Sequence, residues 1–429
     1  MNGARVVGLV LAAIMISSTL AGCAAGGAQA GVAQAAVPRE AKPQVAAAEV
    51  PALVAGNSAF AFDLYRALRG QEGNLFYSPY SVSLALAATY AGARGQTEAQ
   101  MAKTLRFPLP QERLHPTYNA LDLELAGRGS GAKGQDGKGF RLRIANSVWG
   151  QTGYQFLPQY LDTLAKNYGA GLRLTDFANA PEPARVAIND WVKEQTEGKI
   201  VDLLPQGTIK NLTRLVLANA VYFNAAWREP FQVAATKPGP FHLLDGKQVS
   251  VPLMNQSQSL RYVLGQGYQA VALPYDGGEV EMLVLVPDAG AFPAFEGALS
   301  GERLAEIVKS LQPRQVELSL PKFNLKSEFG LGDTLAALGM PDALNPAQAD
   351  FSGMNGKRDL YVQAVVHKAV VTVDERGTEA AAATGVVVGV TSAPANPVTL
   401  TVDRPFVFLI RDVKTGTVLF LGRVLNPAV

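Results

Sequence analysis

The sequence has few of the residues from which disulfides, metal sites and nucleic-acid interfaces are built. Its 429 residues include one cysteine and three histidines, so an internal disulfide is excluded and a Cys/His zinc site would be hard to assemble. The 38 Lys and Arg residues almost balance the 36 Asp and Glu residues and form no stripe, which argues against a nucleic-acid partner. With 48% hydrophobic residues, the composition is typical of a globular chain and excludes disorder. No metal or other cofactor is expected.

The sequence also lacks the short motifs of the common enzyme classes. It contains no Gly-x-Ser-x-Gly elbow, no His-Glu-x-x-His and no phosphate loop. His115 stands beside Pro116 in an expected loop, His242 lies in Phe-His-Leu-Leu, and His367 lies within an apolar strand-like run. A buried, hydrogen-bonded structural role is favoured for His367. We therefore expect a protein that is not an enzyme.

Residues 1–22 are typical of a signal peptide. Arg5 precedes an apolar run at 6–16 that is too short to span a bilayer as a stable helix. The run ends in Leu20-Ala21-Gly22-Cys23, which resembles the lipobox of bacterial lipoproteins, where the cysteine is lipidated and becomes the new N-terminus. Several acyl chains would anchor the protein durably to a membrane. The alternative is an ordinary secretory signal with an incidental cysteine.

The remaining chain divides into a lipidated N-terminus with a tether and one large domain. Residues 23–55 are rich in Ala, Gln, Gly and Pro without a sustained period, which predicts a flexible tether. Residues 56–429 are expected to form the folded domain, and the glycine-rich stretch 127–139 is expected to be a loop within it. The lipobox resemblance implies a bacterial, extracellular protein of the cell envelope, lipid-anchored on the outside of the cytoplasmic membrane or at the outer membrane or cell surface.

Helical patterns dominate the first half of this domain and strand patterns the second. Apolar residues recur at helical spacing over 59–68, and Ser78-Pro79 is a capped helix start before the Ala/Leu-rich run 81–90. Strand-like runs lie at 215–223, 270–273, 281–286, 315–320, 362–373, 399–402, 406–410 and 418–424. The pattern predicts an α+β fold with large sheets.

The stretch 371–394 permits two structures. By propensity its alanine run favours a short surface helix. With the period of a strand, Thr378, Ala380, Ala382 and Thr384 fall on one face, and Glu379, Ala381 and Ala383 fall on the other. Such small side chains could enter between existing strands without a clash.

Five separate motifs resemble one family. Glu375-Arg-Gly-Thr-Glu-Ala-Ala-Ala-Ala-Thr384 resembles the hinge of the serpin reactive-centre loop. Further serpin-like motifs lie at 74–81, 219–227, 366–369 and 403–408, and the resemblance extends over essentially all of residues 57–427. It implies the serpin fold: a large central β-sheet with further sheets, about eight to nine helices and an exposed reactive-centre loop.

The resemblance also assigns expected roles to particular residues. The hinge residues would be Glu375, Gly377, Thr378, Ala380, Ala381, Ala382, Ala383 and Thr384. Ser78, Ser81, Asn219 and His367 would lie together in the shutter beneath the sheet, and Trp227 in the breach where the loop first enters.

By resemblance, the protein is a suicide substrate of serine proteases or, for some members, cysteine proteases. The protease forms an acyl-enzyme on the exposed loop, and the freed hinge strand inserts into the sheet and traps the enzyme. Small hinge residues favour rapid insertion, and every hinge position matches the inhibitory pattern. A monomer is expected. A non-inhibitory serpin acting as a chaperone or binding module remains the alternative.

The scissile bond is expected sixteen residues beyond the hinge glutamate. Counting from Glu375 gives Thr391-Ser392, although Val390-Thr391 and Ser392-Ala393 stay open because the loop is longer than usual on the leaving side. Residues 385–397 contain no charged or aromatic side chain. This predicts an elastase-like or subtilisin-like target rather than trypsin.

Overall fold

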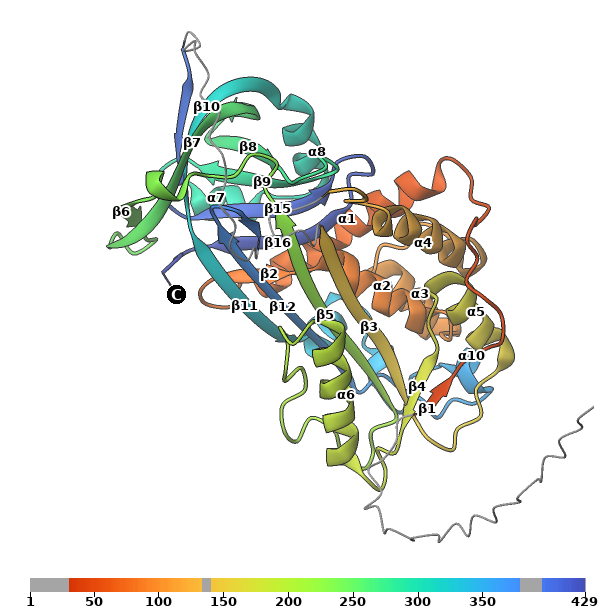
Figure 1. The fold of residues 1–429 in the computed structure, drawn as a ribbon. Coiled ribbons are helices and arrows are strands. Elements are labelled where there is room, and N and C mark those ends of the chain that lie inside the picture. The colour runs from red at the N-terminus through yellow and green to blue at the C-terminus, as the bar shows by residue number, and fades with distance from the viewer. Residues whose placement is uncertain (1–30, 133–139, 379–395, 429) are drawn as a thin grey trace, which may run out of the picture.

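The computed structural model describes residues 31–132, 140–378 and 396–428. In these ranges the chain forms two large β-sheets and ten α-helices (Figure 1). The helices are α1 (Glu49–Leu68), α2 (Pro79–Tyr90), α3 (Gly95–Thr104), α4 (Gln111–Ala126), α5 (Pro158–Tyr168), α6 (Pro181–Gln195), α7 (Phe292–Gly297), α8 (Gly301–Ser310), α9 (Gly332–Leu338) and α10 (Ser352–Asn355), with 3-10 turns η1 (Val233–Ala235) and η2 (Asp342–Leu344).

The first sheet has seven strands. In spatial order they are β1 (Gly31–Ala33), β4 (Leu172–Thr175), β3 (Arg141–Gln151), β5 (Leu215–Ala226), β13 (Gly377–Thr378), β12 (Ala364–Asp374) and β11 (Phe323–Gly330). All twelve residues of β5 are buried. A strand covered on both faces carries a nearly continuous apolar run, as this sequence does, instead of an alternation.

The second sheet has nine strands. Eight lie in the order β14 (Val398–Thr401), β10 (Gln312–Pro321), β7 (Gln248–Gly265), β8 (Tyr268–Pro274), β9 (Val280–Pro287), β15 (Phe406–Asp412), β16 (Val418–Val424) and β2 (Leu75–Tyr77), and β6 (Lys237–His242) pairs with β7. The expectation of an α+β fold with large sheets is confirmed.

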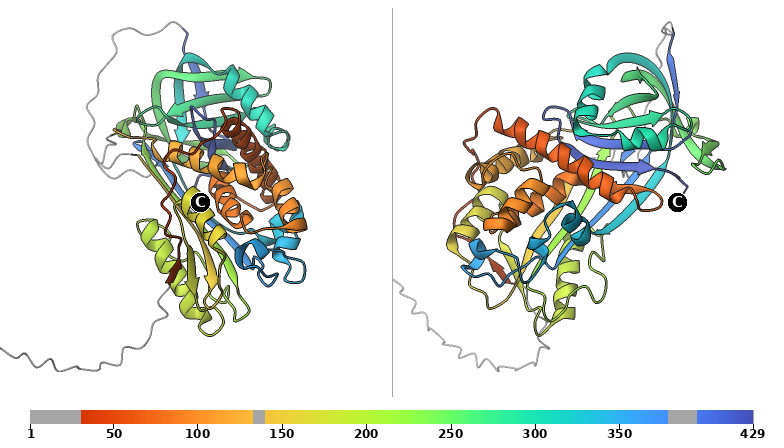
Figure 2. Two further views of the ribbon diagram at one scale, coloured as in Figure 1. Left: turned by 90° about the vertical axis from the view of Figure 1, so that its right-hand side faces the viewer. Right: turned by 180° about the vertical axis from the view of Figure 1, so that it is seen from behind.

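Helices cover both faces of the first sheet (Figure 2). On one face α2 lies against β3 and β5, and all twelve of its residues are buried because it also contacts β16 of the second sheet. Its start is as the sequence predicts, since the Ser78 side chain accepts a hydrogen bond from the Ser81 N–H at 3.2 Å. On the other face α6 packs Ile188 and Val192 into a separate core with Val216.

The described part of the chain contains more helices than the eight to nine expected. The shortest are α10 with four residues, α7 with six and α9 with seven. Helices of one or two turns give almost no periodic signal in a sequence. The expected loop at His115 is wrong, because this residue lies inside α4 and its neighbour Pro116 is accommodated within the helix.

Residues 31–55 differ from the tether expected over 23–55. Strand β1 pairs antiparallel with β4 and forms the edge of the first sheet, and α1 already begins at Glu49. A Cβ at Gly171 would lie 2.6 Å from Val32 Cγ1, so this glycine allows β1 its close approach. Farther along, Arg39 pairs with Asp122 of α4 at 2.6 Å. Periodicity in the sequence could not reveal this segment. Strand β1 has only three residues, too few to show a period, and the residues that the segment contacts are distant in sequence.

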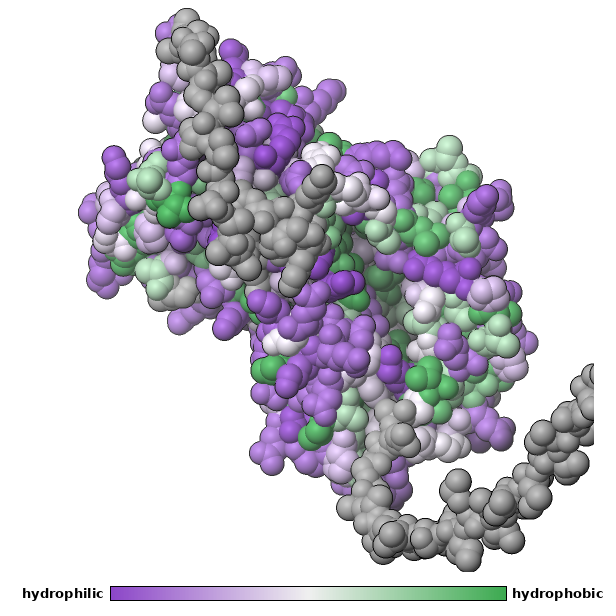
Figure 3. All heavy atoms as spheres, viewed as in Figure 1, coloured by the Kyte–Doolittle hydropathy of each residue, from purple (hydrophilic) through white to green (hydrophobic). Residues whose placement is uncertain are grey.

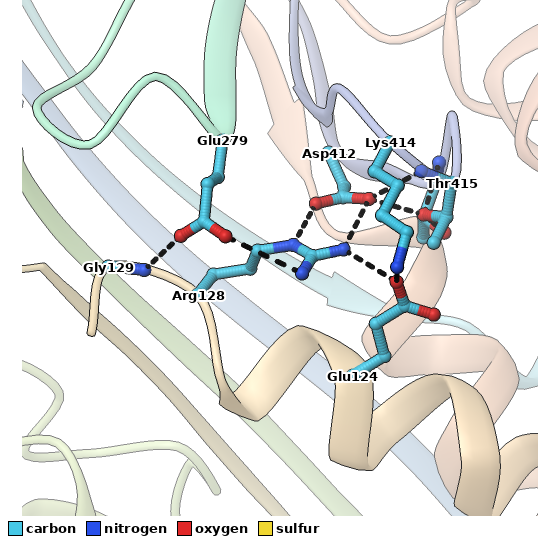
Figure 4. A network of polar contacts seen from close by, with 8 residues as sticks. Glu124, Arg128, Gly129, Glu279, Asp412, Lys414 and Thr415 are labelled. Atoms are coloured by element: carbon cyan, nitrogen blue, oxygen red, sulfur yellow. Dashed lines mark hydrogen bonds and ion pairs between the residues drawn. The ribbon is translucent and has the colours of Figure 1, made fainter.

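A polar network joins α4 to the second sheet (Figure 4). The Arg128 guanidinium contacts the fully buried Asp412, and it also pairs with Glu124 at 3.0 Å and Glu279 at 3.7 Å. Burial works to raise the pKa of Asp412, but hydrogen bonds from Arg128 and Thr415 lower that pKa overall. The network fixes the end of α4 against the loops that follow β15 and precede β9.

The described surface is mainly hydrophilic on the face shown in Figure 3, with small separate apolar areas. The most exposed large apolar side chains are Leu212, Leu264 and Val233, at 72%, 71% and 69%. Among the helices in the described ranges, none combines the length and apolarity needed to cross a membrane.

Candidate functional site

The boundary between β5 and β12 differs along its length. From Ala364 to Val370, β12 pairs directly and in parallel with residues 216–222 of β5. Beyond this stretch, toward the upper end in Figure 1, β13 lies between the two strands. Thr378 pairs with Val373 on one side and with Ala225 on the other, antiparallel to both. The site therefore has two parts. In the closed part, from Ala364 to Val370, β12 pairs directly with β5, and in the separated part the hinge residues of β13 lie between these two strands.

The gap between β5 and β12 is so narrow at position 377 that only glycine fits there. Its φ is +155°, and a Cβ at this position would lie 2.1 Å from the carbonyl oxygen of Ala225 and 2.7 Å from the Ala226 Cα. No side chain can occupy that volume, since the neighbouring atoms belong to the backbone of β5. Glycine is thus needed for close approach as well as for the backbone freedom expected at the pivot.

Thr378 lies fully inside the sheet. Its side chain is 0% exposed, and its hydroxyl lies 2.7 Å from the Tyr275 hydroxyl. Burial raises the pKa of Tyr275 well above its usual range, while the hydrogen bond with Thr378 opposes this rise. Two neutral hydroxyls therefore satisfy each other, and the pocket offers room for a small polar residue.

Glu375 anchors the chain just before the hinge. Its carboxylate accepts hydrogen bonds from the Lys322 ammonium and the Thr236 hydroxyl, both at 2.8 Å, and its carbonyl accepts the Phe231 N–H at 2.7 Å. Burial works to raise the pKa of Glu375, but the hydrogen bonds and the charge of Lys322 lower it overall. The turn that carries the hinge back toward the sheet is therefore fixed by a charged contact.

Trp227 closes the end of this gap. Its indole stacks on Tyr275 with ring centroids 4.6 Å apart, and its Nε1 donates to the carbonyl of Asp374 at 2.9 Å. Its backbone N–H donates to the carbonyl of Arg376 at 2.8 Å. Trp227 therefore contacts the chain on the approach to the hinge, at the position expected for the breach.

A second polar cluster lies beneath the closed part of the boundary. His367 of β12 is 0% exposed, its Nε2 accepts the Ser78 N–H at 3.1 Å, and its Nδ1 contacts the Asn219 side-chain oxygen. Because Nε2 accepts a hydrogen bond, the neutral ring carries its proton on Nδ1 and donates it to Asn219. Burial lowers the pKa of His367 to about 3, which keeps the ring neutral.

Asn146 of β3 completes this cluster and was not among the expected residues. The Ser81 hydroxyl donates to its Oδ1 at 2.9 Å, and its Nδ2 donates to the Ser81 carbonyl at 3.0 Å. Asn219 Nδ2 donates to the Ser81 hydroxyl at 2.7 Å. The structure thus brings Ser78, Ser81, Asn219 and His367 together, with Asn146 as a fifth member. The sequence gives no clear signal for Asn146, because β3 also carries Arg141, Arg143, Ser147 and Gln151.

The serpin family model, described as serine protease inhibitor, matches residues 55–427. This chain belongs to the serpin family. It is 39% identical over 391 residues to human leukocyte elastase inhibitor, covering 87% of this chain and 99% of the relative, and 39% identical to an uncharacterized serpin-like protein of Thermococcus kodakarensis, covering 88% and 86%.

Solved serpin structures agree with the whole architecture. Native tengpin, a thermophilic serpin, superposes with a TM-score of 0.80 at 28% identity and covers 93% of this chain and 100% of its own. Uncleaved ovalbumin has a TM-score of 0.77 at 26% identity, covering 88% and 100%. Serpins are protease inhibitors rather than enzymes. The candidate functional site is therefore the serpin sheet.

Several residues with expected roles lie outside the described ranges. These are the lipidation residue Cys23, the hinge residues Ala380, Ala381, Ala382, Ala383 and Thr384, and the reactive-bond residues Thr391 and Ser392. In residues 31–132, 140–378 and 396–428 there is no group of three or more His, Cys, Asp or Glu side chains arranged to hold a metal ion.

The serpin sheet has a geometry suited to receiving a strand. Because β5 and β12 are parallel, a strand that continues from Thr378 can run antiparallel to both, as β13 already does. Each backbone group on both sides of such a strand gains a ladder partner, while the single ladder between β5 and β12 is lost.

Proposed function

We propose that this serpin inhibits serine proteases as a suicide substrate. The observation that carries the proposal is the placement of Gly377 and Thr378 between β5 and β12, ahead of a run of small residues. Cleavage of the loop by the protease would give an acyl-enzyme and free the strand that continues from Thr378. Insertion of this strand would then carry the bound protease along the sheet before the acyl bond is hydrolysed.

We propose further that the target is an elastase-like or subtilisin-like serine protease. The loop sequence from 385 to 397 offers only small, β-branched, hydroxyl, amide and proline side chains, which suit a shallow apolar pocket. The relatives with about 39% identity include leukocyte elastase inhibitors of several vertebrates. Thr391-Ser392 is the proposed scissile bond, and some serpins also take cysteine proteases.

The test is incubation with elastase, subtilisin, trypsin and chymotrypsin, followed by denaturing electrophoresis. A complex that survives denaturation is expected with the first two enzymes. Mass spectrometry of the released peptide should give Ser392 as its N-terminus, and Thr391→Arg should redirect inhibition toward trypsin. Cleavage of the loop by elastase and subtilisin without any trapped complex would instead favour the non-inhibitory alternative.

We propose that Cys23 carries a lipid and attaches the serpin to the outer side of a bacterial envelope membrane. Support comes from Leu20-Ala21-Gly22-Cys23, which ends on the sole cysteine. From Cys23 to Gly31 the extended chain spans at most about 28 Å, which would keep the β1 edge of the sheet close to the anchor. Cys23→Ala should release the protein from membranes or leave it unprocessed. If the Cys23→Ala protein still fractionates with membranes and still carries labelled acyl chains, the proposed anchor is wrong.

A further inference from the structure

The turn from Lys210 to Thr213 lies at the lower end of the first sheet in Figure 1, just before β5 begins. The Thr213 hydroxyl accepts the Lys210 N–H at 2.9 Å, and the Thr213 N–H donates to the Lys210 carbonyl at 2.9 Å. The Asn211 side chain donates to the Ala178 carbonyl at 2.7 Å, which joins the turn to the segment that follows β4. Hydrogen bonds within the turn and to its neighbour therefore hold its backbone in place.

Leu212 is a central residue of this turn and is 72% exposed. The Arg214 guanidinium donates to the carbonyls of Asn211 and Thr213 on either side of it, both at 2.8 Å. A single exposed leucine needs no explanation by itself. A leucine on a backbone that is already fixed loses little further freedom when a partner covers it, so it suits an apolar contact.

The register of the sheet leads an inserted strand to this turn. Thr378 pairs with Ala225 of β5 in antiparallel register, so each further residue of the strand would pair with the preceding residue of β5. Continued in this register, the strand would pass the first residue of β5 at Val388 and reach the level of Leu212 at Thr391. The residue proposed to carry the acyl bond would therefore arrive beside the turn.

Strand β12, on the other side of the boundary, gives the same level. Thr378 pairs with Val373 of β12, and in this register Thr391 would fall opposite Leu360. The parallel register between β12 and β5, continued by four residues, places Leu360 level with Leu212. Because Leu360 is only 1% exposed, Leu212 is the leucine at this level that a partner can reach.

We infer that Leu212 packs against the trapped protease beside the acyl bond and shields this bond from water. The inference rests on the suicide-substrate mechanism proposed above. A scissile bond one residue to either side of Thr391-Ser392 would move the acyl bond by one position and keep it beside the same turn.

The shielded bond is the ester between the Thr391 carbonyl carbon and the oxygen of the protease serine. Hydrolysis adds one water to this carbon and breaks its bond to the serine oxygen. One proton of the water passes to the serine, and the Thr391 carboxyl group is left with the hydroxyl. The protease is then released in active form. An apolar side chain packed beside the ester keeps water away from the carbon, so the complex lasts longer.

The first test measures the lifetime of the covalent complex between the intact serpin and elastase, from the return of elastase activity after the complex is isolated. Leu212→Ser should form as much complex as the wild-type protein but shorten its lifetime about tenfold, because one apolar contact is lost. Leu212→Met keeps an apolar side chain and should restore most of the lifetime. The matched control is Leu264→Ser in β7 of the second sheet, where the leucine is 71% exposed; its complex should last as long as the wild-type complex.

The outcomes separate this inference from the proposed inhibition. Equal lifetimes for Leu212→Ser and Leu264→Ser overturn the inference and leave the inhibition intact. A Leu212→Ser protein that forms less complex but loses it at the wild-type rate overturns the inference as well, since Leu212 would then act during insertion. A wild-type protein that traps no protease overturns both.

The second test detects the contact itself. A polarity-sensitive dye attached to Leu212→Cys, in protein that also carries Cys23→Ala, should report a less polar environment when elastase is trapped. The same dye at Leu264→Cys should not respond. Elastase whose active-site serine is replaced by alanine can bind the loop but forms no ester, so it should leave the dye at position 212 unchanged. A response at position 212 to both forms of elastase, or to neither, overturns the inference.

Discussion

The two parts of the boundary between β5 and β12 involve the same two strands but differ in their contacts. The strands pair directly in the closed part, and β13 lies between them in the separated part. In the closed part, direct pairing from Ala364 to Val370 lies over the buried cluster of His367 and Asn219. In the separated part, Gly377 and Thr378 occupy the gap and pair with both strands. Gly377 lies close to the backbone of β5, and the Thr378 hydroxyl contacts the Tyr275 hydroxyl. Specific polar contacts thus lie beneath the closed part of the boundary, and small residues lie between the two strands in the separated part.

This difference separates two tasks of an inhibitory serpin. In the proposed mechanism, the uncleaved protein must resist spontaneous insertion, and we expect this resistance to depend on the closed part. The cleaved protein must insert rapidly, and we expect this rate to depend on the small side chains that follow the hinge. Changes in the separated part should therefore affect inhibition first, while changes in the closed part should affect stability first.

The largest effect is expected from Thr378→Arg. The Thr378 side chain is fully buried, and placing an unpaired charge there costs several kcal/mol. The variant should be cleaved as a substrate, and the number of inhibitor molecules consumed per trapped protease should rise at least about tenfold. The control Thr152→Arg introduces the same charge at an exposed position and should inhibit normally. Equal stoichiometry in both variants would refute insertion at Thr378.

His367→Phe tests the closed part. It leaves the Ser78 N–H and the Asn219 side-chain oxygen without their partner, and should lower the free energy of unfolding by about 3 kcal/mol. Urea denaturation measures this loss. His242→Phe, at an exposed position, should change it little. If the two variants are equally stable, the cluster does not fasten the sheet.

As the pH falls, the histidines should lower the stability of the fold before the contacts of Glu375 at the hinge are lost. The pKa of both His115 and His367 is lowered to about 3, whereas an unfolded histidine titrates near 6.5. Below pH 6.5 the unfolded state therefore binds more protons, and stability falls by about 1.4 kcal/mol per pH unit for each histidine. Glu375, with its lowered pKa, loses its contribution only below about pH 4.5.

The pH dependence can be isolated by denaturation between pH 6.5 and 5, above the range of most carboxylates. His367→Phe should reduce the slope by about 1.4 kcal/mol per pH unit. An identical slope in the wild-type protein and this variant would show that His367 does not stay neutral in the fold.

Gly377→Ala probes the close approach in the separated part. The new methyl group would overlap the Ala225 carbonyl oxygen, so either the hinge leaves the gap or the strands shift, at about 2 kcal/mol. Denaturation followed by tryptophan fluorescence measures the change, since Trp227 contacts this segment. Gly330→Ala, in the same sheet but with open space around its Cβ, is the matched control. A similar effect at both glycines would contradict the proposed overlap.

The smallest effect is expected at the N-terminal edge, away from both parts. Arg39 pairs with Asp122 at 2.6 Å and donates to Asn119 at 2.8 Å, and its side chain is 28% exposed. Arg39→Ala should cost about 1 kcal/mol, as for a partly exposed ion pair, and leave the stoichiometry of inhibition unchanged. Lys42→Ala, at an exposed neighbouring position, is the control for calorimetry. A changed stoichiometry would show that the edge is coupled to the boundary.

The sequence by itself determined the fold class and most of the large strands. Continuous apolar runs such as β5 and the Ser78-Pro79 helix start are local signals, and here each local signal agrees with the global fold. The serpin resemblance then named Thr378, His367 and Trp227 because their motifs are short and contiguous.

Only the tertiary structure decided which distant groups meet. Three features join segments far apart in the chain: the closeness of Gly377 to Ala225, the contacts of Asn146 in the shutter, and the strand formed by residues 31–33. No periodicity records such contacts, since a single glycine or asparagine is compatible with many environments. Whether it is buried, and against what, depends on the packing of the whole sheet.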